Sequence, residues 1–340
     1  MSNLIPISWS DFLPPFLWAV GLSLTLTGAV KWVATKFRIY GPTTQHHDER
    51  LIPRLGGIAI YITFLATFLW FVDLTPPRLG FLLGMSIIFL MGLLDDLRSM
   101  PAPIKLLWQV TAIIIAVSFG VHIGQITNPL GGVIILSPLF DYGLSVLWLM
   151  VVTNALNILD GLDGLAAGVT SIFSVILFIL SLFIIVNQPA TATMAVILLG
   201  SAVGFLWWNW HPAKIFMGDS GSNMLGFMMG ALAIISGAKI ATAALVLGFP
   251  IFDLLWAGWR RWRQGRSPLA ADREHLHHRL LDAGVSHRNV VLIILSIAGV
   301  FGAVSLLSGT WAKILALFGG ALLMIMLIRT VFFIQRRKSS

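Results

Sequence analysis

Long apolar runs separated by short polar segments dominate the chain. About eleven of these runs approach 20 residues, the length with which an α-helix crosses the hydrocarbon core of a bilayer. They predict transmembrane helices whose boundaries are good to a few residues. The expected helices cover residues 13–33, 55–72, 79–95, 104–122, 140–157, 164–186, 191–208, 222–237, 239–258, 290–308 and 312–332.

Composition supports the same fold class. The chain is 57% hydrophobic and 11% charged, with a mean hydropathy of +0.90, so its apolar surface requires a bilayer. Cysteine is absent, which excludes disulfides and thiolate metal sites. The first ten residues lack the basic region of a cleavable signal peptide, so we expect the first helix to be retained. We therefore predict an all-α integral membrane protein, a polytopic bundle forming one domain over residues 1–340.

The distribution of lysine and arginine predicts the orientation of the bundle. If the N-terminus is outside and the C-terminus cytoplasmic, only Arg78, Lys239 and Lys313 lie on outer loops, and the other 19 of 22 basic residues are cytoplasmic. The net charge of +8 follows from this rule and indicates a lipid bilayer, with no nucleic acid, as partner. The cytoplasmic loops expected to carry the chemistry cover residues 35–55, 95–104, 157–163, 209–221 and 259–289.

Amide and carboxylate side chains recur at three-residue intervals in the segment NALNILDGLDGLAAG. They are Asn154, Asn157, Asp160 and Asp163. This spacing puts successive members on neighbouring positions of a helix surface, and the glycines allow the chain to turn away. A carboxylate at membrane depth costs free energy and is by default a functional-site candidate. We expect this ridge to hold a divalent cation rather than to serve only as a helix cap.

Acidic residues also end the third expected helix. The helix macrodipole disfavours Asp95 and Asp96 at a C-terminus, which suggests that they have a function. Adjacent residues on a helix point about 100° apart, so we expect the two carboxylates to have different roles.

The segment FMGDSGSNMLG is expected to form a tight turn before the eighth helix. Ser220 and Ser222 are predicted N-cap residues, and the free amides of that helix could receive a phosphate oxygen. Asp219 would then stand where a metal bridges protein and phosphate. Phe216 and Trp210 offer faces on which a base could stack, although tryptophans more often mark the membrane interface.

Two polar connections contain histidines. The longer one carries the segment DREHLHHRL with His275, His277 and His278. Three histidines could form a zinc site, but no acid or fourth ligand completes a known spacing. Histidines flanked by arginines better suit a pyrophosphate or a leaving phosphate. No role is assigned to the polar residues of the shorter connection, which are His46, His47, Arg50 and Arg54.

The segments LLDDL, NALNILDGLDGLAAG, FMGDSGSNMLG and DREHLHHRL occur in this order. In this combination, nearly the whole chain resembles the polyprenyl-phosphate N-acetylhexosamine-1-phosphate transferase family. The His-Leu-His-His form resembles the branch that uses UDP-N-acetylglucosamine to start wall teichoic acid, O-antigen or related glycans. The branch that uses UDP-N-acetylmuramoyl-pentapeptide usually shows three consecutive histidines. The basic run that usually precedes PRLGG stands here in altered register, as HHDERLI.

The resemblance implies an enzyme of the bacterial cytoplasmic membrane whose active site faces the cytoplasm. It would transfer N-acetylglucosamine 1-phosphate from UDP-N-acetylglucosamine to undecaprenyl phosphate. A phosphate oxygen of the lipid attacks the β-phosphorus of the UDP-sugar, and UMP leaves. The resemblance also implies Mg²⁺ as cofactor, with Mn²⁺ as a substitute, and a homodimer.

Roles follow by matching motif positions to the family. Asn157 and Asp219 are expected metal ligands, and Asp160 is expected to support the metal or the diphosphate. Asp95, with Asp96 beside it, is expected to orient or deprotonate the lipid phosphate, while a covalent route through Asp219 stays open. The expected substrate contacts are Asn154, Asp163, Asn209, Phe216, Arg273, His275, His277 and His278.

Two other classes share some of these features. An ion-coupled transporter would also need intramembrane Asn and Asp, but it predicts charges near the midplane and broken inverted repeats. A membrane metal hydrolase acting on a lipid pyrophosphate would need the acids and histidines but no uridine contact. Nucleotide-dependent turnover separates the three classes.

Overall fold

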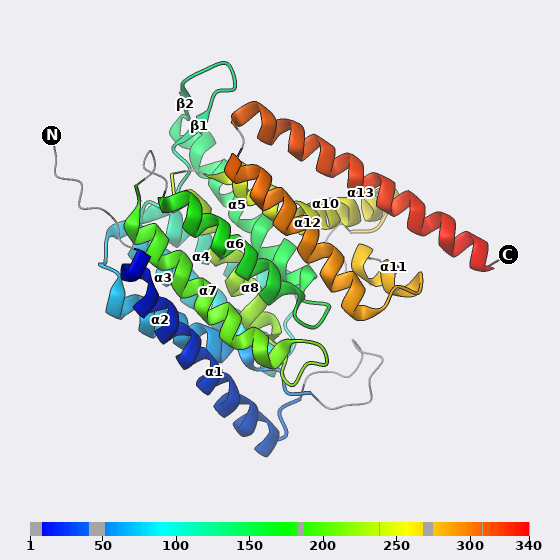
Figure 1. Ribbon diagram of the computed structural model, residues 1–340, viewed down its shortest axis with the longest axis horizontal. Coiled ribbons are helices and arrows are strands. Elements are labelled where there is room, and N and C mark those ends of the chain that lie inside the picture. The colour runs from blue at the N-terminus through cyan, green and yellow to red at the C-terminus, as the bar shows by residue number, and fades with distance from the viewer. Residues whose placement is uncertain are drawn as a thin grey trace.

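The computed structural model describes residues 9–40, 52–182, 187–237, 239–267, 275–307 and 309–339. Within these ranges the chain is a bundle of helices with one small hairpin (Figure 1). The helices of the first half are η1 (Trp9–Phe12), α1 (Leu13–Lys36), α2 (Gly56–Phe71), α3 (Pro76–Leu97), α4 (Ala102–Ser118) and α5 (Pro138–Leu159). Those of the second half are α6 (Leu165–Leu182), α7 (Pro189–Asn209), α8 (Gly218–Ile235), α9 (Ile240–Val246), α10 (Gly248–Arg263), α11 (Leu276–Asp282), α12 (His287–Leu307) and α13 (Thr310–Ser339).

The helices establish a multi-pass membrane protein. Seven of those described are long and apolar enough to cross a bilayer alone, namely α1, α3, α5, α6, α7, α12 and α13. The pair α9 and α10 provides an eighth span if it crosses as one unit. The expected number of eleven is not confirmed, because α2 and α4 have only 16 and 17 residues and α8 begins with the polar segment GDSGSN.

The expected helix over residues 239–258 is broken. Its two parts, α9 and α10, meet at an angle of 79° near Leu247. Pro250 explains the break, since it has no N–H to donate to the carbonyl of Val246 and its ring would collide with that carbonyl. The only strands described are β1 (Gln125–Thr127) and β2 (Val133–Ile135), which pair antiparallel between α4 and α5.

Small residues allow α1 and α7 to pack closely along their length (Figure 1). A Cβ atom on Gly200 would lie 2.7 Å from Ala19 Cβ, and one on Gly204 would lie 2.6 Å from Ser23 Cβ. The Ser23 hydroxyl donates to the carbonyl of Ser201 at 2.7 Å. Close backbone approach with a hydrogen bond across it is typical of helix association in lipid.

Helix α8 forms the centre of the bundle. Almost all of its residues are buried, and it packs against α3 and α5. The Trp148 indole N–H donates to the carbonyl of Gly230 at 3.0 Å and ties α5 to α8. Since Asp219 lies in the first turn of this central helix, the packing of α8 fixes its position.

Candidate active site

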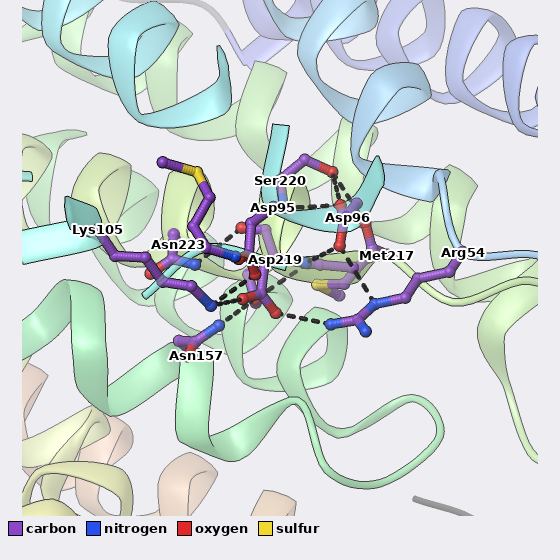
Figure 2. Close-up of polar contacts among 12 residues, drawn as sticks. Arg54, Asp95, Asp96, Lys105, Asn157, Met217, Asp219, Ser220 and Asn223 are labelled. Carbon is purple, nitrogen blue, oxygen red and sulfur yellow. Dashed lines mark hydrogen bonds and ion pairs between the residues drawn. The ribbon is translucent and has the colours of Figure 1, made fainter. Parts of the chain in front are cut away.

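Four helix ends meet around Asp219. It lies where α8 begins, beside the C-terminal end of α3 and the N-terminal ends of α2 and α4. Arg54 Nη2 lies 2.7 Å from Asp219 Oδ1, and Lys105 Nζ lies 3.0 Å from Asp219 Oδ2. Figure 2 shows the two cations approaching the carboxylate from opposite sides. A single carboxylate therefore links two segments that lie 165 and 114 residues away from it along the chain.

Asp96 occupies the amide groups that open α8. Its fully buried carboxylate accepts the main-chain N–H groups of Asp219 at 2.8 Å and Ser220 at 3.0 Å, and the Ser220 hydroxyl at 2.6 Å. It also pairs with Arg54 Nε at 3.2 Å. These amides were expected to receive a phosphate oxygen, but an internal carboxylate satisfies two of them.

The N-cap prediction for Ser220 and Ser222 is wrong. Helix α8 begins at Gly218, so both serines lie inside its first turns, and the cap residue Met217 makes no side-chain bond. The Ser222 hydroxyl donates back to the carbonyl of Gly218 at 3.0 Å. The helix starts earlier than expected because Asp96 takes over the capping, and Gly218, with φ of 74°, leaves room for its carboxylate.

Asp95 has different partners from its neighbour. Its carboxylate accepts the N–H of Met100 at 2.6 Å and pairs with Lys105 at 2.5 Å. The two adjacent acids therefore pair with different cations, Asp95 with Lys105 and Asp96 with Arg54, as the 100° step of a helix predicted.

The segment around Arg54 joins the site by pairing with the chain before α8. The N–H of Phe216 donates to the carbonyl of Pro53 at 2.8 Å. The N–H groups of Gly56 and Gly57 donate to the carbonyls of Phe216 and Met217 at 2.9 and 2.8 Å. This pairing places Arg54 beside Asp96 and Asp219. Burial lowers the pKa of Arg54, but the carboxylates of Asp219 and Asp96 raise it by more, so it stays charged.

Close contact between Gly57 and α8 leads to a testable prediction. A Cβ atom at Gly57 would collide with the main-chain nitrogen of Gly221 and lie 2.5 Å from Ser220 Oγ. Because the collision is with backbone, Gly57→Ala should destabilise the protein by about 1–3 kcal/mol and lower its melting temperature in detergent. Gly21→Ala is the control, since Gly21 has nothing within 4 Å of the added atom. Equal melting temperatures for both variants would contradict the close contact.

The amides of α5 reach Asp219 through a chain of hydrogen bonds. Asn154 donates to Gln109 at 3.1 Å, Gln109 donates to Asn223 at 3.0 Å, and Asn223 donates to the carbonyl of Asp219 at 2.9 Å. Asn157 donates to the Ser222 hydroxyl at 2.9 Å. The ridge and the start of α8 are therefore one polar network.

Asp160 follows the last turn of α5 and faces the same cluster. Burial raises its pKa well above the usual range, against the influence of Arg54, and the carboxylates of Asp219 and Asp96 raise it further. The ionised form of Asp160 is thus disfavoured by burial and by the neighbouring carboxylates.

Asp163 and Asn209 hold together the loops after α5 and α7. Asp163 Oδ2 lies 2.8 Å from His211 Nδ1 and accepts the N–H of Ala213 at 3.1 Å. Asn209 accepts the N–H of Gly164 at 3.0 Å and donates to the carbonyl of Ile215 at 2.9 Å. The buried second oxygen of Asp163, Oδ1, has no protein partner. The uridine contacts expected of both residues stay predictions.

One group of ligand atoms in the described part of the chain is compact enough for a metal ion. It consists of Asp163, His211 and His287, whose ligand atoms lie within 4.8 Å of one another. The rings of His211 and His287 are stacked at 4.2 Å with only 18° between their planes. Nearly parallel rings do not direct two nitrogen lone pairs at one ion, so we assign this group to the hydrogen-bonded structure of the loop.

The HLHH segment packs onto the loop after α5. A Cβ atom on Gly161 would lie 2.7 Å from His277 Nε2 and 3.3 Å from His278 Nε2. On the other side, buried Asp253 of α10 accepts the N–H of Leu276 at 3.0 Å. Its second oxygen lies 3.2 Å from His275 Nδ1 and 3.7 Å from His277 Nδ1. Asp253 thus lies on the Nδ1 side of His277, while Nε2 faces the loop at Gly161.

Some expected residues lie outside the described chain, and others were missed. Those outside are His46, His47, Arg50 and Arg273. Neither Arg54 nor Lys105 had an assigned role from the sequence. Asp253 was not identified, since 22 residues separate it from the first histidine, His275. An acid within an apolar segment was the available signal.

Most of the segments that build this site match a known protein family. The family described as "Glycosyl transferase family 4" matches residues 78–237, the range that contains Asp95, Asp96, the α5 ridge and Asp219. A Bacillus subtilis (strain 168) protein named "Probable undecaprenyl-phosphate N-acetylglucosaminyl 1-phosphate transferase" is 35% identical over 311 residues, covering 87% of this chain and 85% of its own. The chain belongs to glycosyl transferase family 4. The resemblance inferred from the four motifs is confirmed.

Other family members extend the similarity. A Mycolicibacterium smegmatis "Decaprenyl-phosphate N-acetylglucosaminephosphotransferase" is 35% identical over 316 residues, covering 82% of this chain and 78% of its own. An Escherichia coli "Undecaprenyl-phosphate alpha-N-acetylglucosaminyl 1-phosphate transferase" is 28% identical over 320 residues, covering 90% of this chain and 85% of its own. The similarity covers most of each chain.

Proposed function

We infer that this protein transfers N-acetylglucosamine 1-phosphate from UDP-N-acetylglucosamine to undecaprenyl phosphate. The products are undecaprenyl-diphospho-N-acetylglucosamine and UMP, and the step initiates a bacterial cell-surface glycan. The observation that carries this inference is the cluster of Asp95, Asp96 and Asp219 with Arg54 and Lys105, in a chain whose relatives are named for this activity.

The reaction exchanges one phosphoanhydride for another. An oxygen of the lipid phosphate forms a bond to the β-phosphorus, the bond from that phosphorus to the bridging oxygen breaks, and UMP leaves with the bridging oxygen. A phosphate monoester is mostly a dianion at pH 7, so Asp95 is assigned to orient the lipid phosphate rather than to remove a proton. The main task of the site is to hold two anions in line and disperse their charge.

Arg54 and Lys105 are the cations placed for this task. In the structure both bind Asp219. Arg54 also contacts Asp96, and Lys105 also contacts Asp95. Substrate phosphates can compete for their N–H groups, because charge-assisted bonds to phosphate and to carboxylate are similar in strength. We assign both residues to the diphosphate and the lipid phosphate.

The charge balance of the cluster supports Mg²⁺, with Mn²⁺ as a substitute. Four carboxylates surround the two cations, counting Asp160, so two negative charges are in excess when all are ionised. Carboxylate and amide oxygens are ligands that Mg²⁺ prefers. Asp219 and Asn157 would hold the ion, with Asp160 in support. Mg²⁺ would neutralise negative charge on the diphosphate oxygens.

The uridine is assigned to the loops that follow α5 and α7. Asp163 Oδ1 is buried and unpartnered, so it can accept the N–H of a uracil ring. Phe216 is half-buried beside the start of α8 and is proposed to stack on the base. His275, His277 and His278 are assigned to the diphosphate or the sugar.

We further propose the orientation of the protein. The N-terminus lies outside, the C-terminus and the candidate site face the cytoplasm, and the membrane is the bacterial cytoplasmic membrane. Eleven crossings result if α2, α4 and α8 each span and α9 with α10 forms one span. Cysteine labelling of single introduced cysteines from each side of the membrane tests this directly, since the native chain has none. A homodimer is a separate proposal, to be measured by the mass of the detergent-solubilised protein.

Release of UMP by the detergent-purified protein tests the function. With UDP-N-acetylglucosamine and Mg²⁺ we expect release only when undecaprenyl phosphate is present, and loss of release when the metal is chelated. Release only with another UDP-N-acetylhexosamine, or with UDP-N-acetylmuramoyl-pentapeptide, would retain the chemistry and change the donor. Phosphate release from a lipid pyrophosphate without nucleotide would favour a hydrolase. No turnover with any donor would contradict the proposal.

A further inference from the structure

Two lysines face each other at the end of the bundle opposite the carboxylate cluster. Lys239 follows the C-terminal end of α8, whereas Asp219 lies at its N-terminal end, about 27 Å away for an 18-residue helix. Lys313 lies in the first turn of α13, which packs against α9. This pair takes no part in the proposed transfer reaction.

The ammonium group of Lys239 has no partner. Its Nζ atom is buried and forms no hydrogen bond, and neither lysine makes an ion pair with any described residue. Burial first, and then the charge of Lys313, lowers the pKa of Lys239 to about 8. A buried charge without a counter-charge is costly, so this end of the bundle lacks a negative group that would stabilise it.

A hydroxyl group completes the arrangement. Lys313 Nζ donates to Thr242 Oγ1 at 3.1 Å, which leaves the proton of that buried hydroxyl available to an anion. Two ammonium groups and one hydroxyl suit a group with several acceptor oxygens. Lysine binds phosphate as a point charge, and a phosphodiester offers two non-bridging oxygens that share its negative charge.

We propose that Lys239, Lys313 and Thr242 bind the phosphate group of an anionic lipid. Helix α13 supports a lipid over free phosphate, because only 11% of its membrane-spanning window is buried within the protein, so acyl chains can lie along it. The loop position of Lys239 and the first-turn position of Lys313 put both charges at the depth of lipid head groups.

Lipid retention tests the site independently of transfer activity. The protein would be reconstituted in nanodiscs of phosphatidylcholine with a minor share of phosphatidylglycerol, and the lipid enriched around it measured after extraction. We expect the double variant Lys239→Gln, Lys313→Gln to bind phosphatidylglycerol about 25-fold more weakly, since each lysine near a membrane surface contributes roughly a factor of five. Arg78→Gln is the control, because Arg78 is basic, lies at the same end of the bundle and bonds the carbonyl of Asp73.

A second measurement tests the site if the double variant folds poorly. In phosphatidylcholine alone, Lys239→Met should melt at a higher temperature than the unchanged protein, because it removes an unpaired buried charge. Added phosphatidylglycerol should narrow this difference in melting temperature, because it pairs with the lysine of the unchanged protein. If inorganic phosphate alone narrows it equally, the site binds phosphate from solution and the lipid source is wrong. Undiminished phosphatidylglycerol binding by the double variant, or an equal loss in Arg78→Gln, would overturn the proposal.

Discussion

Replacing Asp219 with asparagine should reduce UMP release by about 10³-fold or more while the protein still folds. The side chain has the same size, and the N–H of residue 219 can still donate to Asp96. What is lost is the charge that binds Arg54 and Lys105 and that is proposed to hold Mg²⁺. Without it, Arg54 and Lys105 each lose an ion-pair partner, and the proposed ion loses an anionic ligand.

The measurement compares initial rates of UMP release at saturating donor and lipid, together with melting temperatures in detergent. Asp73→Asn is the matched control, because Asp73 is an exposed acid in the connection between α2 and α3, at the other end of both helices. The control should retain full activity. Near-normal release by Asp219→Asn would exclude the metal and electrostatic roles assigned to this residue.

Replacing His277 with alanine should lower turnover by about 10²-fold, as expected for the loss of a hydrogen bond to a charged group in a buried site. His277 is almost fully buried, with Nε2 against the loop at Gly161 and Nδ1 towards Asp253. Asp253→Asn should have a smaller effect of about tenfold, because an asparagine still accepts the N–H of Leu276 but removes the negative charge beside His275 and His277.

The control for this pair is Asp141→Asn. Asp141 is also buried and pairs with His122 at 2.6 Å, but at the first turn of α5, the end away from the site. It should change stability and leave turnover intact. The amount of each variant in the membrane is measured beside its activity. Loss of His277→Ala from the membrane fraction would show that the HLHH segment is structural.

The helices were predictable because a bilayer demands about 20 apolar residues in succession, and that demand is local. Each expected helix has a counterpart, and most boundaries agree within a few residues. The exceptions have identifiable causes. Pro250 divides the ninth expected helix, and α8 starts four residues early because a carboxylate from another helix caps it.

The candidate site was predictable as a set of residues but not as an arrangement. Asp160 was identified because charge at membrane depth is costly. Asp95 and Asp96 were identified because the helix macrodipole disfavours acids at a C-terminus, and Asp219 because it lies beside the amides that open a helix. Nothing in the sequence indicated that Asp96 would occupy the amides of α8, or that Asp219 would be shared between Arg54 and Lys105. Those pairings depend on the three-dimensional approach of four helix ends.

By itself the sequence determined that this is a helical membrane protein with acidic and histidine segments in a fixed order. The length of an apolar run and the rarity of charge within it are properties of short segments, so they can be recognised without the tertiary structure. Only the tertiary structure decided which charges meet. Asp253 of α10 meets the histidines because α11 packs beside it, and Arg54 reaches Asp219 because Gly57 lets α2 approach α8. Electrostatic pairing falls off with distance in space and not along the chain, so partners far apart in sequence become visible only when the helices are packed.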